Sequence, residues 1–387
     1  MLADTATQRA ARRSAGVSPA RTVEFVDARD ISLVERPWTE LEARCDASFF
    51  QSWGWIGCWL RTLPHDRRIV AAIVREGHAV VGLALFGKSR STRHGVVSSR
   101  GYHLNEAGDA HHDCLTIEYN GLLAEPARLS DLIESCLGAL VEDAKDWDEL
   151  FIGGVDARQS AAFTAATRKL HLAQRVVYEK PCYFVDLDAA RAKGDYLSLV
   201  SANTRHQIRR ATKLYEEHGK VMLENARSAE EAFAFLDGLE ELHQAYWRKR
   251  GHPGSFANPY FANFHRQLIR DRFATGQIQL ARIASASRVI GYLYNFVYRG
   301  RVYTYQSGFQ YDADNKRKPG LVSHHLAIEH HLRAGAHFYD FLAGEGQHKQ
   351  SLATNVHSLA WLVAQRKRLK FRIENALRQV KHRFAAQ

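Results

Sequence analysis

The stretch HFYDFLAGEGQHK ends a predicted strand and carries an acid, an imidazole and an amine: Asp340, Glu345, His348 and Lys349. Because side chains alternate along a strand, Asp340 points to the face opposite its aromatic neighbours. Groups of these types can move a proton to or from a reacting amine. The alternative is an ion-pair network that holds the loop after the strand.

A basic turn opens a predicted helix just before this strand, in NKRKPGLVSHHLAIEHHLRAG. The first N–H groups of a helix are unpaired and carry partial positive charge, so a pyrophosphate can bind there. The alternative is an ordinary helix start, since a single glycine before a helix is common. The predicted phosphate contacts are Arg317, Lys318, Gly320 and Leu321.

Histidines in and after this helix raise the question of a metal site. His324 and His331 share a face but lie about 10 Å apart along the axis, which is too far for one ion. His325 and Glu329 are close enough to share an ion, but the sequence places no third ligand. We therefore predict no metal, with histidines that are partly buried or on the surface.

Two further predicted helices carry cations beside an apolar face. The helix from Ser201 to Gly219 projects Arg205, Arg209 and Arg210, either as a solvated face or as a clamp for an anionic ligand. A second helix ends with Trp247, Arg248 and Arg250 before the stretch GHPGSFANPY. Cations there ordinarily complement the helix dipole, but with this stretch they also suit the wall and lid of a substrate cleft.

The chain repeats one pattern of elements. RRIVAAIVREGHAVVGLALFGK and QIQLARIASASRVIGYLYNFVYRGRVYTYQSGF both predict a strand, a polar turn and a second strand. Gly82 and Gly291 hold the same place in the two copies, where a missing side chain permits a bulge. A helix and a strand follow in each copy, so we predict two copies of one α/β unit.

Length and charge agree with this organisation. The 387 residues suit two domains, and no apolar run approaches the length that spans a bilayer. The net charge of +11 is concentrated at the chain ends, where residues 361–387 hold eight Lys or Arg against Glu374. Five scattered cysteines without a CxxC spacing favour a reducing cytoplasm over a disulfide framework or a zinc site.

Several motifs occur in an order that points to a known family: SANTRHQIRRATKLYEEHG, HQAYWRKRG, GYLYNFVYRGRVYTYQSGF, KPGLVSHHLAIEHHLRAG and YDFLAGEGQHK. Together they resemble the CelD/BcsL-like group of GNAT acyltransferases, relatives of the FemABX peptidyltransferases with two GNAT-like units in tandem. The resemblance is good over residues 180–350 and weaker in the first half, through FFQSWGWIGCWL and LTIEYNGLL. It implies an α/β fold of two tandem GNAT-like units, each a mixed, mostly antiparallel sheet flanked by helices.

The expected division of the chain follows from the repeat and this resemblance. We expect a disordered arm at 1–20, an N-terminal unit without a donor site at 21–180, a C-terminal unit with the acyl-donor site at 181–355, and a basic amphipathic helix at 356–387. The first copy lacks a donor loop at YNGLLAEPARLSD.

The resemblance also implies a reaction, the transfer of an acyl group from a thioester such as acetyl-CoA to an amine or hydroxyl. The family's Arg/Gln-x-x-Gly-x-Gly/Ala loop fits at Arg317 and Gly320 but meets Val322 where a small residue is expected. Because FemABX relatives have altered this loop, an aminoacyl-tRNA donor stays open.

The resemblance gives roles to individual residues. Asp340 or Glu345 is the expected base, and Tyr303 or Tyr305 the expected acid. Lys349 is expected to contact substrate or an acidic neighbour. Trp247, Arg248, Arg250 and His348 are the expected substrate contacts.

Three functions remain after this reading. The first is an acyltransferase acting on a small-molecule, cell-envelope or exopolysaccharide precursor, and the second an aminoacyl-tRNA-dependent peptidyltransferase that binds tRNA through the basic tail. The third is a non-catalytic scaffold whose tail contacts a membrane or a partner. The tail would use one apolar face: Leu369, Ile373, Leu377, Val380 and Phe384.

Overall fold

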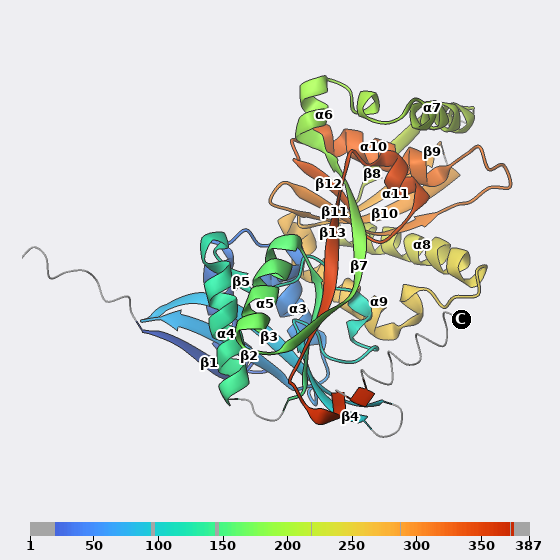
Figure 1. Ribbon diagram of the computed structural model, residues 1–387. Helices are drawn as coiled ribbons and strands as arrows, with labels where there is room; N and C mark the ends of the chain where they lie inside the picture. The colour runs from blue at the N-terminus through green and yellow to red at the C-terminus, as the bar shows by residue number, and fades with distance from the viewer. Residues whose placement is uncertain are drawn as a thin grey trace, which may run out of the picture.

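The computed structural model describes residues 20–93, 97–143, 147–217, 219–286, 288–371 and 373–374. Of the predicted arm at 1–20, all but the last residue lies outside this description. The described strands join into one continuous sheet (Figure 1). Its order is β1 (Arg21–Asp27), β2 (Ile69–Glu76), β3 (Ala79–Arg93), β4 (Val97–Leu104), β6 (Glu149–Val155), β13 (Asn355–Gln365), β7 (Ala173–Asp186), β12 (Phe338–Ala343), β11 (Arg301–Phe309), β10 (Arg288–Tyr298), β9 (Ile278–Ser285) and β8 (Val221–Asn225), with β5 (Leu123–Ala124) beside β3.

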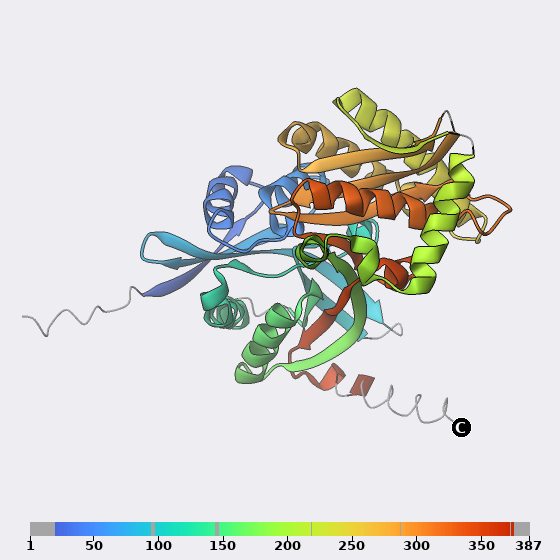
Figure 2. The same ribbon diagram turned by 90° about the horizontal axis from the view of Figure 1, so that it is seen from above.

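Helices cover both faces of this sheet (Figure 2). Most begin at a side chain that accepts a hydrogen bond from the first turn, as Ser201 does for α7 and Ser228 for α8. The helices are α2 (Glu35–Glu42), α3 (Trp53–Thr62), α4 (Leu129–Asp143), α5 (Ala157–Lys169), α6 (Leu187–Lys193), α7 (Ala202–Glu216), α8 (Ala229–Arg248), α9 (Pro259–Arg272), α10 (Pro319–Arg333) and α11 (Gln347–Leu352).

The predicted repeat is confirmed. Strands β1 to β4 and β6 have the same order as β8 to β12, and each set ends in a parallel pair, β4 with β6 and β11 with β12. The register shifts at Val81 in β3 and at Ile290 in β10, each time just before the predicted glycine. At Gly291 a Cβ atom would lie 2.5 Å from the Phe309 ring, so no larger residue fits there.

The strands after α5 and α11 are exchanged between the two units. β7 follows the first unit but pairs with β12, and β13 follows the second unit but pairs with β6. β7 and β13 also pair with each other along residues 173–184 and 355–365. The predicted boundary at residues 180 and 181 therefore falls inside one strand.

The predicted C-terminal helix starts too early. Residues 356–365 belong to strand β13 in the centre of the sheet, where β6 and β7 flank the strand and Ala360, Leu362 and Ala364 are buried in one apolar cluster. Residues 369–371 and 373–374 are helical, and Leu369 and Ile373 are exposed. Leu377, Val380 and Phe384, which would continue the predicted apolar face, lie outside the described residues.

One face of the sheet has a core that spans both units. Phe49 and Trp55 of the first unit pack on Phe264 and Phe296 of the second, with Phe49 stacked on Phe296 at a centroid distance of 4.4 Å. On the opposite face, α4 and α5 cover one cluster and α7 and α10 another. The two units therefore share one core and one sheet.

We predict that Phe49→Ala destabilises the whole chain. The substitution leaves a cavity between the units and should lower the free energy of unfolding by about 3–5 kcal/mol. Thermal unfolding followed by circular dichroism and by tryptophan fluorescence should show one shifted transition. Leu33→Ala, at an exposed side chain, is the control with little expected change. Two separate transitions, with one unmoved, would contradict a shared core.

Candidate active site

A cleft opens in the second unit where two parallel strands diverge. β11 and β12 pair from Arg301 and Phe338 only as far as Tyr303 and Asp340. Beyond these residues the two strands separate and border a cavity of about 370 Å³. It is lined mainly by β11, the end of β12, α10, α11 and the loop after β4, and its lining includes Glu118, Trp247, Tyr305, His324, His348 and Lys349.

A bulge in β12 produces this divergence. Leu342 has a φ of +60°, a left-handed backbone conformation that costs energy for a residue with a side chain. The Leu342 N–H donates to the Asp340 carboxylate at 2.8 Å, and the Ala343 N–H donates to Glu118 Oε2 at 2.6 Å. Lys349 Nζ donates to both carbonyls of the bulge at 3.1 Å. Three ionisable side chains thus hold one strained turn.

Glu118 is a candidate functional residue that the sequence did not predict. It comes from the first unit, within the weakly matching stretch LTIEYNGLL, but lines the cleft of the second. Only 7% of the residue is exposed, and burial raises the pKa of its carboxyl to about 7. Such a group can both accept and release a proton near neutral pH.

The same loop fills the corresponding place in the first unit. Asn120 forms a parallel bridge with Val155 of β6, where β4 has already ended. Its side chain donates to the Leu104 carbonyl at 2.8 Å and accepts from Asn105 at 2.7 Å. The chain itself therefore pairs with the end of β6, past the last residue of β4.

Asp340 does not line the cleft. Its fully buried carboxylate pairs with Arg301 at 3.0 Å and accepts hydrogen bonds from Tyr119 and Cys182. Tyr119 also contacts His357 of β13 at 2.9 Å. For Asp340 the structure displays the ion-pair alternative, on the face opposite its aromatic neighbours as the alternation predicted.

Other predicted catalytic residues fall both inside and outside the cleft. Lys349 and His348 line it, but from helix α11 rather than from the predicted loop. Tyr305 also lines it and donates its hydroxyl hydrogen to the Leu115 carbonyl at 2.5 Å. Glu345 is exposed and does not line the cleft, and Tyr303 lines a different pocket.

Burial sets the charge of the groups in the cleft. It lowers the pKa of His348 to about 4 and holds the pKa of His324 well below its usual range. The two rings are stacked at 5.6 Å, and the His324 Nδ1 contacts the Tyr339 hydroxyl at 3.0 Å. Burial also lowers the pKa of Lys349, which Glu118 partly offsets. Near neutral pH the imidazoles are therefore neutral.

The predicted phosphate turn opens α10 beside the cleft. Lys318 caps the helix with a φ of +38°, and Pro319, which has no N–H, is its first residue. The N–H groups of Leu321 and Val322 donate to the Lys318 carbonyl, which leaves the Gly320 N–H for an anion. Arg317 lies at the same turn, with its buried Nη1 lacking a hydrogen-bond partner in the described structure. An anion fits this donor set.

Of the three substrate contacts predicted at the end of α8, one lines the cleft and two do not. Trp247 lines the cleft together with Ser255 from the following segment. Arg248 is exposed, and Arg250 lies over the ring of Tyr246 at 3.6 Å, outside the cleft lining. Only Trp247 therefore forms part of the predicted wall.

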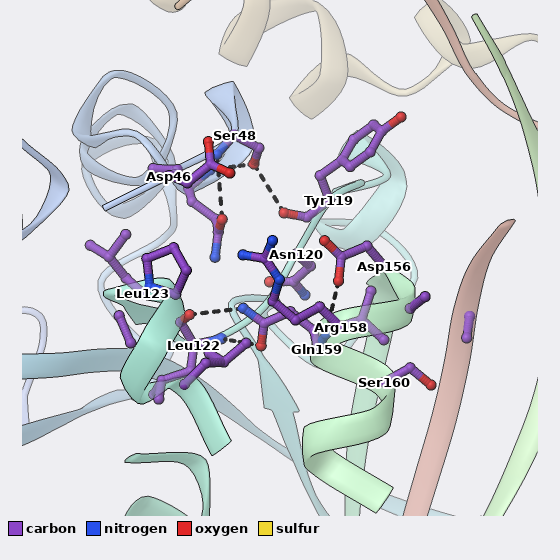
Figure 3. Close-up of a pocket in the computed structure, with 18 of the residues that line it drawn as sticks. Asp46, Ser48, Tyr119, Asn120, Leu122, Leu123, Asp156, Arg158, Gln159 and Ser160 are labelled. Carbon is purple, nitrogen blue, oxygen red and sulfur yellow. Dashed lines mark hydrogen bonds between the residues drawn. The ribbon is translucent and has the colours of Figure 1, made fainter. Parts of the chain in front are cut away.

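A second, larger cavity of about 680 Å³ lies in the first unit (Figure 3). It is bordered by the start of α5, where Asp156 accepts from the Gln159 N–H at 2.8 Å, and by Arg301 and Tyr303 of the second unit. Tyr119 lines this cavity and its neighbour Glu118 lines the cleft. One loop thus reaches both cavities.

The histidines that suggested a metal have other contacts. His331 bonds to Gln279 at 2.9 Å, His330 contacts Asn225 at 3.1 Å and His337 pairs with Asp188 at 2.9 Å. Within the described ranges, no three His, Cys, Asp or Glu side chains lie close enough to hold a metal ion. No helix among the described residues has the length and apolar character needed to cross a membrane.

Comparisons with known proteins agree with this geometry. Residues 202–350 match the family described as "Acetyltransferase (GNAT) domain". A search of curated proteins found no match. The second unit is therefore similar to a GNAT acetyltransferase domain over residues 202–350.

Solved structures with the same fold cover most of the chain. The crystal structure of FemX is 10% identical, covers 84% of this chain and 95% of its own, and has a TM-score of 0.56. The C-terminal domain of a putative lysylphosphatidylglycerol synthetase from Agrobacterium fabrum is 11% identical, with coverages of 86% and 91% and a TM-score of 0.51. L-PGS from Bacillus licheniformis is 11% identical, with coverages of 86% and 92% and a TM-score of 0.50.

At these identities the likeness concerns the fold alone. Together with the repeated topology, it confirms the predicted fold class, an α/β fold with GNAT-like units in tandem. The narrower CelD/BcsL-like group stays a prediction.

We predict that Glu118 makes stability fall as pH rises. The folded carboxyl holds its proton up to about pH 7, whereas an unfolded glutamate loses it near 4.3. The unfolded state therefore binds fewer protons in this window, and the free energy of unfolding declines with pH. Between pH 4 and pH 8, Glu118→Gln should gain about 1–3 kcal/mol relative to the wild type.

Urea unfolding at both pH values measures this difference. The same substitution at the exposed Glu345 is the matched control. Parallel changes in the two variants would contradict an unfavourably buried Glu118 carboxylate.

Proposed function

We propose that this protein transfers an acyl group from acyl-CoA, with acetyl-CoA as the first candidate, to an amine or hydroxyl of a small-molecule, cell-envelope or exopolysaccharide precursor. The observation that carries the proposal is the cleft between β11 and β12, which is lined by Glu118 and by His324 of α10, the helix that begins at the predicted phosphate turn. The match of residues 202–350 to a GNAT acetyltransferase domain supports the same reaction class.

Two parts of CoA, the pyrophosphate and the extended arm that carries the thiol, fit the cleft. The pyrophosphate would meet the Gly320 N–H, Arg317 and Lys318 at the start of α10. A Cβ at Gly320 would lie 3.3 Å from the Phe309 ring, so the glycine keeps the backbone close to this strand. Past Tyr303, β11 has no partner strand on the side of β12, so its backbone groups are available to the donor arm.

The chemistry needs one proton acceptor. Glu118 takes the proton from the attacking amine or hydroxyl, a new C–N or C–O bond forms, and the C–S bond breaks. Tyr305 lines the cleft, and its hydroxyl would turn from the Leu115 carbonyl to supply a proton to the departing sulfur, which leaves as the CoA thiol. Asp340 and Lys349 act on this site by holding the β12 bulge, as positioning residues.

We predict that Gly320→Glu abolishes donor binding. The carboxylate would meet the pyrophosphate and crowd Phe309, so the affinity for CoA should fall at least about tenfold. Isothermal titration calorimetry with CoA measures the loss. Gly138→Glu makes the same change on α4, where only Leu170 lies within 4 Å, and should bind CoA as the wild type does.

Two results would remove acyl-CoA as the donor. One is no heat with the wild type, and the other is equal affinity after Gly320→Glu. If tRNA then binds with an affinity that falls steeply with added salt, the donor is an aminoacyl-tRNA.

We predict that Glu118→Gln lowers kcat by about 10²–10⁴-fold and leaves CoA affinity unchanged. The base must be deprotonated, so wild-type activity should rise with pH through about 7, the pKa of Glu118. The activity of the variant should not show this rise with pH. Release of CoA thiol over pH 5–9 measures both effects, and Glu345→Gln is the control. Loss of activity in Glu345→Gln alone would give the base role to Glu345 instead.

A further inference from the structure

A cluster of aromatic and charged side chains lies on the exchanged strands. Tyr178 of β7 stacks on Trp361 of β13 with a centroid distance of 4.8 Å and an interplanar angle of 28°. The Lys180 ammonium lies 5.2 Å from the first ring centroid and 5.3 Å from the second. Glu106, from the loop after β4, lies beside the indole. We call Tyr178, Trp361, Lys180 and Glu106 the aromatic platform.

The floor of the aromatic platform is Gly153 of β6. A Cβ there would lie 3.0 Å from Trp361 Nε1 and 3.3 Å from Glu106 Oε2. Any other residue would push the indole and the carboxyl away from the sheet. The missing side chain therefore lets two groups of different chemistry lie together against the strand.

The aromatic platform is open to solvent at Tyr178 and Lys180, while Trp361 and Glu106 are half-buried. Tyr178 is 44% exposed, and Val176 and Val177 before it are also exposed. A single exposed apolar residue needs no explanation, but a stacked pair with a cation and a carboxyl around it is typical of binding surfaces. Burial raises the pKa of the Glu106 carboxyl, so this group can be protonated near neutral pH and donate a hydrogen bond.

The aromatic platform leads toward the cleft. Ala343, which lines the cleft, pairs with Cys182, and the Gly344 N–H donates to the Pro181 carbonyl at 2.9 Å. Lys180 is the next residue of β7, and Tyr178 lies about 13 Å along the strand from Cys182. Lys180 lies close enough to the cleft to lower the pKa of both Glu118 and Lys349, so one extended ligand can contact the aromatic platform and the cleft.

We propose that the aromatic platform binds a pyranose ring of the acceptor, which makes the acceptor a saccharide. A pyranose has a face of C–H groups that stacks on an aromatic ring and a rim of hydroxyls that bond to Lys180 and Glu106. One cation and one carboxyl provide no excess charge for a phosphate-rich ligand. The acceptor role rests on the proposed acyl transfer, in which Glu118 takes the proton from this saccharide.

Saturation-transfer NMR with the donor-free, full-length protein tests the proposal. The probes are glucosamine, its dimer and cellotriose. We expect the wild type to transfer saturation to the ring C–H protons and to bind the dimer or the trimer more tightly than the single ring. Tyr178→Ala and Trp361→Ala should each weaken this binding about fivefold or more.

A second stacked pair provides a matched control. Tyr311 is 53% exposed and stacks on Tyr246 at 5.0 Å and 28°, with Arg250 over the second ring. Tyr311→Ala should bind the saccharides as the wild type does. Trp361→Phe keeps a ring at the aromatic platform and should restore part of the binding if Trp361→Ala folds poorly.

The outcomes separate this proposal from the proposed reaction. Glu118→Gln should bind the saccharides normally while it loses acyl transfer. Saccharide binding without CoA binding would keep the aromatic platform and overturn the acyl-CoA reaction. No binding by the wild type at tens of millimolar of each probe, or equal binding by Tyr178→Ala, Trp361→Ala and Tyr311→Ala, would overturn the aromatic platform.

Discussion

The exchange of β7 and β13 between the two units is the constraint on which the rest of the structure depends. Each unit needs a strand from the other half of the chain to complete its part of the sheet. The exchanged strands bring Cys182 and His357 opposite each other, next to the buried pair of Arg301 and Asp340. The candidate site and the aromatic platform therefore both lie at the junction of the units.

One loop takes a different place in each of the two similar units. A parallel pair that diverges leaves backbone groups without strand partners, and such groups must be paired or solvated. In the first unit Asn120 supplies the partner from the chain itself. In the second, the same loop contributes Glu118 to the wall and supports the β12 bulge, so the space beside β11 stays open. The loop therefore pairs with β6 in the first unit and lines the cleft of the second.

Local features were predictable because they depend on chain neighbours. The caps at Ser201 and the bulges before Gly82 and Gly291 follow from residue type and period. Residue type and spacing also predicted the turn at Arg317 and Gly320, which begins the helix that lines the cleft. His348 and Lys349 also reached the cleft, since they follow β12 directly. Asp340 was assigned to the correct face, and an ion-pair network was one of its two alternatives, but the sequence did not identify Arg301 as the partner.

The sequence by itself determined the repeated α/β unit, the helix starts and the place of the phosphate turn, because periodicity and capping are properties of short segments. Only the tertiary structure decided that residues 356–365 form a central strand and that Glu118 crosses to the other unit's cleft. Strand partners are separated by many residues along the chain, so no local sequence pattern identifies them. Burial also sets the proton affinity of Glu118, and burial exists only once both units are packed together.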